Sequence, residues 1–241
     1  MKIGIVVPWD SPFIYTSNAF NMMNWERPKG CELNFIIGKG WCPAAKHNDG
    51  VRKAQDWGAD FILFNGGDHL CPKDIIPRML KRIDEGWDMV QATIPLRGSG
   101  NYIPIPFTGI SYKVVGNIPY IDDHANIPRS AVEILTDMQE PQESHICGTG
   151  NVLMKADIFD KLSKPYFKEY LQNDDYYKRY PIQDTRFIYE CTKKAGARLI
   201  FDTDIRLVHL DVFGIDDTYK DRFKDKAAKS WTPSKDIEEY L

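Results

Sequence analysis

The stretch FILFNGGDHL, at residues 61–70, constrains the fold of this chain more than any other. Its first four residues form a short apolar run bounded by turn residues. Such a run predicts a strand buried on both faces, as in the parallel sheet of an α/β protein. Gly66 and Gly67 then allow a sharp turn, and Asp68 places an acid at the end of the strand. Open α/β sheets bind ligands at the carboxyl ends of their strands, so Asp68 is a candidate site residue. The alternative is an ordinary Gly-Asp turn with a solvated carboxylate.

Strand and helix patterns alternate on both sides of this stretch. Asp74 stands where a helix N-cap is expected, before a helix with one apolar face. The predicted strands are residues 2–7, 33–37, 88–93, 151–154, 198–201 and 205–209, and the predicted helices are residues 44–57, 75–83 and 184–195. This order predicts a single α/β domain over residues 1–241, with a mostly parallel twisted sheet flanked by helices. Residues 101–144 are interpreted as a possible insertion, and a charged C-terminal tail begins at residue 220.

Composition excludes some classes of protein. The formal net charge of -3 does not indicate a dedicated nucleic-acid-binding protein, although a nucleic-acid partner stays possible. The five cysteines are an odd number and include no C-x-x-C pair, which predicts reduced thiols in a cytoplasmic protein. No run approaches the roughly 18 apolar residues of a membrane span, so no stable membrane insertion is expected.

Four motifs occur in a fixed order along the chain. They are GIVVPWD, then WGADFILFNGGDH followed by PKD, then GTGNVLMKADIFDKL, and last QDTRFIYECTKKAGARLIFDTDIRLVHLD. Together they resemble the nucleotide-sugar-dependent glycosyltransferases of the GT-A fold, most closely the family-two-like group of bacterial or phage type. The resemblance spans roughly residues 1–211, with the middle segment unmatched. It implies a GT-A, nucleotide-diphospho-sugar transferase-like fold.

The resemblance also implies a metal site. Sugar transfer releases a diphosphate, and a divalent cation neutralises the charge that develops on it. By the resemblance, Asp68 holds Mn or Mg, and His209 reaches the same ion from the last strand. Carboxylate oxygen suits both ions, and manganese tolerates imidazole. His209 on an apolar strand has the alternative of being a satisfied core histidine.

The motif around Asp68 departs from the family pattern. The family has an Asp-x-Asp pair, and this chain has Gly66-Gly67-Asp68, so the first acid is missing. Asn65, or the waters of the ion, are expected to take over the contact of that acid with the ribose or the water shell. His69 is not counted as a ligand, because adjacent side chains in a loop usually diverge.

Asp184 matches the second position of the family's Glu-Asp pair, with Gln183 in place of the Glu. In inverting members that acid is the general base, which accepts the proton of the acceptor hydroxyl. A helix N-terminus favours the carboxylate form through the helix dipole. The alternative is a plain N-cap.

Further residues match positions that bind the donor. The resemblance implies a nucleotide pocket lined by some of them and a floor near the donor sugar formed by the others. The pocket residues are Pro8, Asp10 and Asn48, and the floor residues are Gly148, Thr149 and Gly150. A solvated helix residue at position 48 and a simple turn at residues 148–150 are the alternatives.

The sequence therefore predicts a metal-dependent glycosyltransferase that moves a sugar from a nucleoside-diphosphate sugar to a hydroxyl acceptor, with inversion. The acceptor stays open among a glycan, a lipid-linked sugar, a small metabolite, a protein and a hydroxylated base in phage DNA. One alternative is a nucleotidyltransferase of related fold. That class normally has a Gly-rich loop with a basic residue after the first strand, which PWDSPF lacks. Another alternative is a non-catalytic nucleotide-sugar-binding protein.

Overall fold

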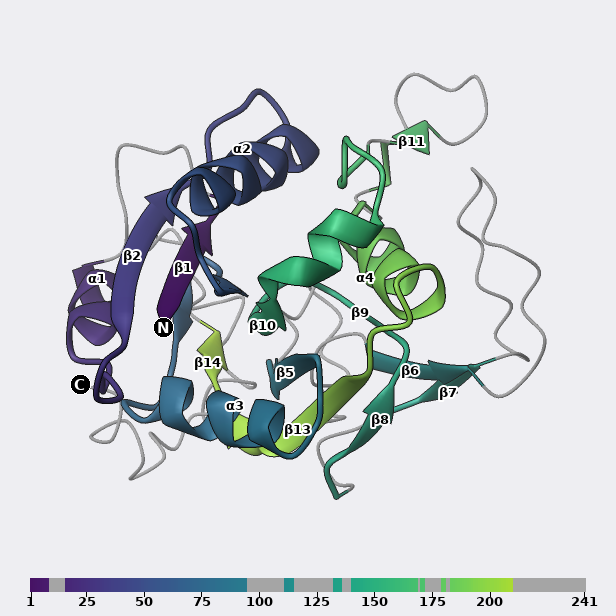
Figure 1. Ribbon diagram of the computed structural model, residues 1–241. Coiled ribbons are helices and arrows are strands. Elements are labelled where there is room, and N and C mark those ends of the chain that lie inside the picture. Colours follow the sequence, from purple (N-terminus) through teal and green to yellow (C-terminus); the bar gives the residue numbers. More distant parts are fainter. Residues whose placement is uncertain are drawn as a thin grey trace, which may run out of the picture.

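The computed structural model describes residues 1–8, 16–94, 111–114, 132–135, 140–168, 170–171, 179–180 and 183–209 (Figure 1). Asp10, much of the segment 101–144 and the tail from residue 220 lie outside these residues. In the part of the chain that is described, no helix combines the length and apolar character that crossing a membrane requires.

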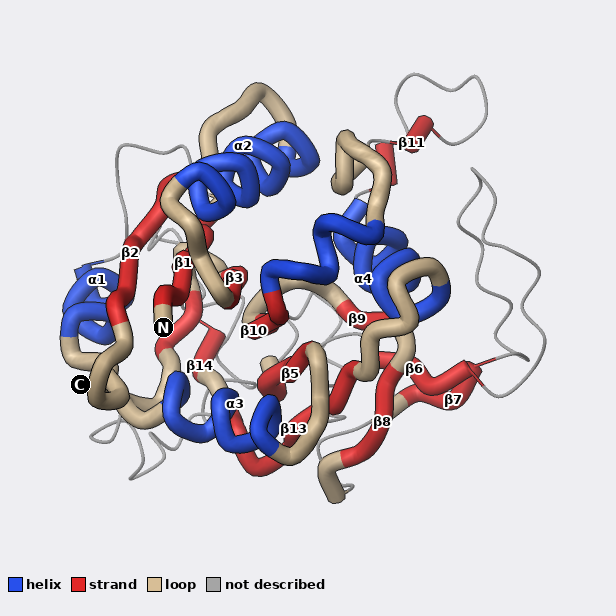
Figure 2. Tube along the Cα trace, viewed as in Figure 1, coloured by secondary structure: helices blue, strands red, loops and turns tan. Residues whose placement is uncertain are grey.

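A seven-stranded sheet forms the centre of the molecule. Its strands, in spatial order, are β2 (Glu32–Ile37), β1 (Lys2–Val7), β3 (Phe61–Phe64), β10 (Val152–Lys155), β5 (Met89–Thr93), β13 (Leu199–Arg206) and β8 (Gln142–Ser144). Strands β10 and β8 run antiparallel to their neighbours, and the other strands are mutually parallel. The α/β fold with a mostly parallel sheet is confirmed. Strand β10 lies between β3 and β5 although it follows both in the sequence (Figure 2).

One detail of the predicted strands is wrong. The runs at residues 198–201 and 205–209 were expected to be separate strands, and the structure continues β13 through most of that span. Its register with β5 shifts between Asp202 and Arg206, and β14 (Val208–His209) follows. Strands β2 and β3 follow each other in the chain but do not pair, because β1 lies between them and is parallel to both.

Helices cover both sides of the sheet. They are α1 (Thr16–Met23), α2 (Pro43–Asp56), α3 (Ile75–Asp84), α4 (Gln183–Lys193) and the 3-10 helix η2 (Ala156–Lys161). Asp74 does precede α3, but its side chain makes no cap hydrogen bond. Its carboxylate instead accepts from Arg78 Nε at 2.7 Å, one turn further along the helix.

Three smaller sheets surround the main one. Strand β4 (His69–Leu70) pairs with β14, β6 (Ser111–Val114) pairs with both β7 (Val132–Ile134) and β9 (Ile146–Cys147), and β11 (Tyr170–Leu171) pairs with β12 (Arg179–Tyr180). The pair β4 and β14 matters most for function, because it lies directly after the Gly-rich turn.

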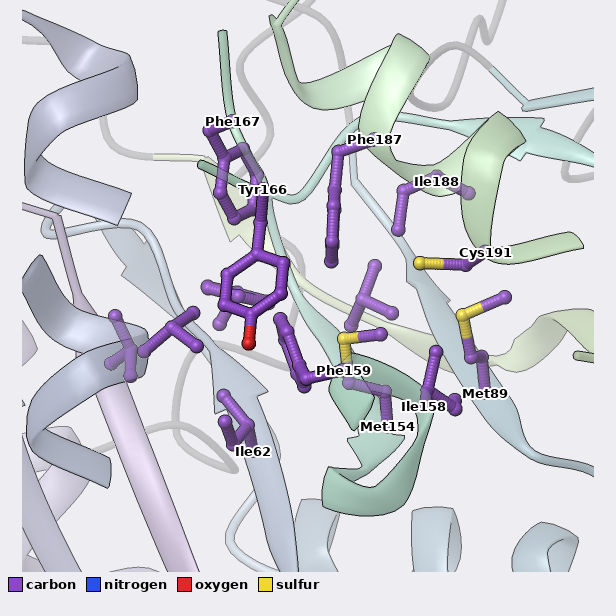
Figure 3. Close-up of a cluster of buried hydrophobic side chains, with 14 of the residues drawn as sticks. Ile62, Met89, Met154, Ile158, Phe159, Tyr166, Phe167, Phe187, Ile188 and Cys191 are labelled. Atoms are coloured by element: carbon purple, nitrogen blue, oxygen red, sulfur yellow. The ribbon is translucent and has the colours of Figure 1, made fainter. Parts of the chain in front are cut away.

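The core consists of two clusters that share strands but use alternate residues. On β3, Ile62 and Phe64 belong to one cluster and Leu63 to the other, because successive side chains of a strand point to opposite faces. The first cluster packs β3 and β10 against α2, η2 and α4, and it is rich in aromatic rings (Figure 3). The second cluster packs the opposite face against α3 and is mainly aliphatic.

Candidate active site

The Gly-rich turn after β3 leads directly into a two-stranded ladder. Strand β14 pairs antiparallel with β4, and His209 stands opposite His69 in the register. Asp68 immediately precedes β4. Asp68 is therefore the neighbour of the residue that pairs with His209, so the backbone brings the two predicted metal-binding residues close together.

The side chains of Asp68 and His69 converge. His69 Nε2 lies 3.6 Å from Asp68 Oδ1, and the side chains are only 6% and 14% exposed, respectively. The expectation that these adjacent side chains diverge is wrong. His69 was left out as a ligand for that reason, and its observed position beside Asp68 makes it a candidate site residue.

Gly66 explains why the first acid of the family pair is missing. A Cβ atom at position 66 would lie 2.6 Å from two atoms of the His69 ring and 2.8 Å from Asp68 Oδ1. No side chain fits there while the imidazole keeps its position. The ring of His69 therefore takes up the space in which a side chain at position 66 would begin.

Asn65 is fully buried and bonded within the protein. Its Oδ1 accepts from Asn151 Nδ2 at 2.8 Å and from Cys71 Sγ at 3.6 Å, and its Nδ2 donates to Met22 Sδ at 3.5 Å. In this arrangement the Asn65 amide holds the end of β3 to the start of β10 and to α1. Pro8, another predicted site residue, directly follows β1 at the same edge of the sheet and is partly buried.

Asp184 lies in the first turn of α4 and faces the turn at residues 148–151. Its Oδ2 accepts from the backbone N–H of Thr149 at 3.4 Å, and its Oδ1 accepts from the N–H of Thr185 at 2.8 Å. A Cβ at Gly148 would stand 3.2 Å from Oδ2, so the absent side chain leaves that side of the carboxylate open. The sequence predicted both Asp184 and this turn as site elements, and the structure brings them together.

His47, on α2, fixes the hydroxyl of Thr149. His47 Nδ1 lies 2.8 Å from the carbonyl oxygen of Pro43, and His47 Nε2 lies 3.0 Å from Thr149 Oγ1. A carbonyl can only accept, so Nδ1 carries the proton and Nε2 accepts from the hydroxyl. Burial lowers the pKa of His47 and outweighs the opposing effects of the Pro43 hydrogen bond and the Asp184 charge, which keeps the ring neutral. Reasoning from the sequence missed this contact, because it joins residues far apart in the chain.

Asn48 organises a loop. Its Nδ2 donates to the carbonyl of Phe167 at 2.7 Å, and its Oδ1 accepts from the N–H of Phe167 at 3.1 Å. The ring of Phe167 stacks on His47 with centroids 4.6 Å apart. Both ends of the Asn48 amide therefore hold the segment that covers His47.

The turn at residues 148–151 lies between Asp184 and the segment that carries Asp68. One end of the turn contacts Asp184. At the other end, a Cβ at Gly150 would lie 3.2 Å from Cε1 of His69, and Asn151 donates to the segment before β4. Strands β3, β5 and β10 meet at this edge, which is the carboxyl end of the parallel strands. This is where open α/β sheets bind their ligands.

Burial suppresses the thiol chemistry of three cysteines, and the described residues form no complete metal-binding group. All five cysteines are free, and burial raises the pKa of Cys71, Cys147 and Cys191, so these thiols are protonated. Among the described residues no group of three or more His, Cys, Asp or Glu side chains could hold a metal ion. Asp68 and His69 do supply a carboxylate and an imidazole, a donor pair that fits Mn²⁺.

The strand order defines an α/β protein with a GT-A-like fold, and at the carboxyl edge of its sheet the start of α4 contacts a Gly-rich turn through Asp184. No protein-family model and no curated protein sequence matches the chain. Among solved structures the chain is similar to A197 from STIV, with 11% sequence identity and a TM-score of 0.55, over 88% of this chain and 86% of that chain. That likeness concerns the fold, and the predicted GT-A-like fold is confirmed at this level.

Two structures of S. aureus TarS 1-349 are also similar. The complex with UDP-GlcNAc has 13% identity and a TM-score of 0.45, over 89% of this chain and 60% of that chain. TarS 1-349 itself has 13% identity and a TM-score of 0.47, over 99% of this chain and 77% of that chain.

Proposed function

We propose that the protein is a metal-dependent glycosyltransferase that transfers a sugar from a nucleoside-diphosphate sugar to a hydroxyl acceptor. One observation carries this proposal. The turn at residues 148–151 contacts Asp184 at one end, and at the other end Gly150 lies beside the ring of His69 and Asn151 bonds to Asn65, at the carboxyl edge of a GT-A-like sheet. A donor bound across that turn has its diphosphate near Asp68 and its anomeric carbon toward Asp184.

In this proposal Asp184 is the general base of an inverting reaction. The acceptor oxygen attacks the anomeric carbon, its proton passes to the Asp184 carboxylate, and the bond from carbon to the diphosphate oxygen breaks. The N–H groups of Thr149 and Thr185 orient the carboxylate, and Gly148 leaves room beside Oδ2. Pre-set hydrogen bonds of this kind save reorganisation during the reaction.

A divalent cation, Mn²⁺ or Mg²⁺ held by Asp68 and His209, would neutralise the charge on the departing diphosphate. Pro8, Asp10, Asn48 and Asn65 are proposed to shape the nucleotide side of the site. The last two do so through the protein contacts of their amides. The floor under the donor sugar is proposed to be residues 148–150.

Ligand-induced thermal stabilisation tests the proposal. Wild type and Asp68→Ala are heated with UDP, GDP, CDP and dTDP sugars, each with and without MnCl₂. A ligand that binds only the native state raises the melting temperature. We expect one nucleotide to stabilise wild type only with Mn²⁺ and to lose this effect in Asp68→Ala. Absence of stabilisation by every donor would contradict the proposal.

A non-catalytic nucleotide-sugar-binding protein is the second candidate. Gly66 and Gln183 favour it, since both stand where the family has an acid. A donor that stabilises the protein but is neither transferred nor hydrolysed over long incubation with Mn²⁺ would support this candidate over the enzyme.

A further inference from the structure

We propose that His69 replaces the missing first acid as a ligand of the divalent cation, beside Asp68, and that its imidazole makes the site prefer Mn²⁺ over Mg²⁺. The inference rests on the cation of the proposed function, but it does not depend on sugar transfer. It concerns the ligand set of this chain, in which position 66 carries no side chain.

The first support is the distance between the two donor atoms. His69 Nε2 and Asp68 Oδ1 are 3.6 Å apart, and both side chains are largely buried. Two ligand atoms that each lie about 2.1 Å from one ion can be at most about 4.2 Å apart. The observed 3.6 Å separation lies within that limit, so the distance is compatible with both atoms binding one cation.

The second support is that two glycines leave the space that the ring occupies. A Cβ at Gly66 would come within 2.6 Å of the ring, and a Cβ at Gly150 would lie 3.2 Å from its Cε1. These glycines belong to the two motifs that meet at the candidate site. A side chain at position 66 would displace the imidazole, so the first acid and His69 in its present place exclude each other.

The third support is the way the backbone of β4 is held. Asn18 Nδ2 donates to the carbonyl of His69. Asn21 bonds both backbone groups of Cys71, accepting from its N–H at 2.8 Å and donating to its carbonyl at 2.8 Å. On the other side β14 pairs with β4, with His209 opposite His69. Helix α1 and β14 thus fix the strand that carries the imidazole.

The chemistry of this donor set predicts the metal preference. Mg²⁺ demands near-ideal octahedral oxygen coordination and usually keeps several waters. Imidazole nitrogen suits transition metals, and carboxylate oxygen suits Mn²⁺ as well. Replacing an acid by His69 therefore weakens the site for Mg²⁺ more than for Mn²⁺.

Calorimetric titration with MnCl₂ and with MgCl₂ tests the inference without any sugar donor. We compare wild type, His69→Gln and Asp68→Asn, with His145→Gln as a control histidine between β8 and β9. We expect wild type and His145→Gln to bind Mn²⁺ more tightly than Mg²⁺. His69→Gln should lose at least about tenfold in Mn²⁺ affinity and most of the preference. Unchanged Mn²⁺ binding in His69→Gln, or no Mn²⁺ binding by wild type, would overturn the inference.

Three further variants test directly whether an acid at position 66 can replace His69 as a ligand of the cation. His69→Ala removes the ring and should lose Mn²⁺ binding. Gly66→Asp in the His69→Ala background restores the acid pair once the ring is gone and Asp68 Oδ1, 2.8 Å from the new Cβ, has turned aside, so metal binding should return with a weaker preference for Mn²⁺ over Mg²⁺. Gly66→Asp alone should lower the melting temperature, because the new Cβ meets the imidazole. If the double variant melts like His69→Ala but regains no metal binding, the exchange is wrong.

These results separate the inference from the proposed function. Mn²⁺ binding that depends on His69 in a protein that no nucleotide sugar stabilises would support the metal site and contradict the glycosyltransferase. Donor binding without any effect of His69→Gln on Mn²⁺ affinity would support the glycosyltransferase and contradict the role of His69 as a metal ligand.

Discussion

Different contacts hold the two acids of the candidate site. Around Asp68, amide side chains bond to the backbone or to one another, as Asn21 does with Cys71 and Asn151 with Asn65. Around Asp184, packing dominates. The rings that pack at the start of α4 include Phe159, Tyr166, Phe167 and Phe187 (Figure 3). The ring of Phe64 lies next to that of Phe187, with centroids 6.3 Å apart. Directional bonds fix the orientation of a backbone segment, whereas rings mainly supply stability through buried area. Changes in the two regions should therefore have different consequences.

Asp184→Asn should have the largest effect. An amide cannot accept the acceptor proton, so kcat should fall by about 10² to 10⁴. Donor binding should stay, because Asn keeps the shape of the side chain. Steady-state kinetics together with donor-induced thermal shift measures both quantities. Asp160→Asn, at an exposed position in η2, is the control. Equal loss of donor binding and kcat would place Asp184 in donor binding instead.

Phe187→Ala tests the packed region. Phe187 is 1% exposed and contacts Phe167 with ring centroids 4.1 Å apart. Removing a buried ring usually costs about 3–5 kcal/mol of unfolding free energy. Urea unfolding measures this cost, and Phe187→Leu should lose much less. Mn²⁺ affinity of the folded variant should stay close to that of wild type. A large loss of Mn²⁺ affinity would show that the two regions are coupled.

Asn21→Ala tests the hydrogen-bonded region. Asn21 bonds both backbone groups of Cys71 and accepts from Trp25 Nε1 at 3.1 Å. Leaving these buried groups without partners should cost about 1–3 kcal/mol in urea unfolding, less than Phe187→Ala. Mn²⁺ affinity should fall here, since the strand that carries His69 loses its support. Intact Mn²⁺ affinity would mean that α1 only stabilises the fold.

His47 gives the smallest effect, a dependence of stability on pH. Burial lowers its pKa in the folded state, so the unfolded chain binds more protons below pH 6.5 and stability falls as the pH decreases. Between about pH 6.5 and 5.5 this should cost at most about 1 kcal/mol. His47→Phe should remove that part of the pH dependence in urea unfolding. An identical pH dependence in both proteins would mean that another group titrates.

The sequence predicts the elements that local patterns determine. The apolar run of β3, the glycines after it and the amphipathic pattern of α4 each lie within one segment, so β3 and α4 were found. The continuation of β13 was missed because Asp202 interrupts its apolar pattern. Asp202 is buried in an ion pair with Arg82, whose Nε lies 2.6 Å from its Oδ2. Such a partner, 120 residues away, cannot be inferred from local sequence.

The candidate site shows the same limit. Asp68, Asp184 and the turn at residues 148–151 were found through their motifs. The imidazole of His69 was not, because its direction depends on packing between Gly66 and Gly150. These contacts form only when distant segments fold together.

The position of β10 has a consequence for the order of folding. Strand β10 lies between β3 and β5 but is synthesised after both, and the turn before it contacts Asp184 and lies beside the ring of His69. The N-terminal strands β1, β2 and β3 can pair while the chain emerges from the ribosome, whereas β5 must wait for residues 152–155 before it joins them. Insertion of β10 joins β3 to β5, but α4, which carries Asp184, and β13 come later in the chain, so a chain that has not yet folded its last third has no assembled site.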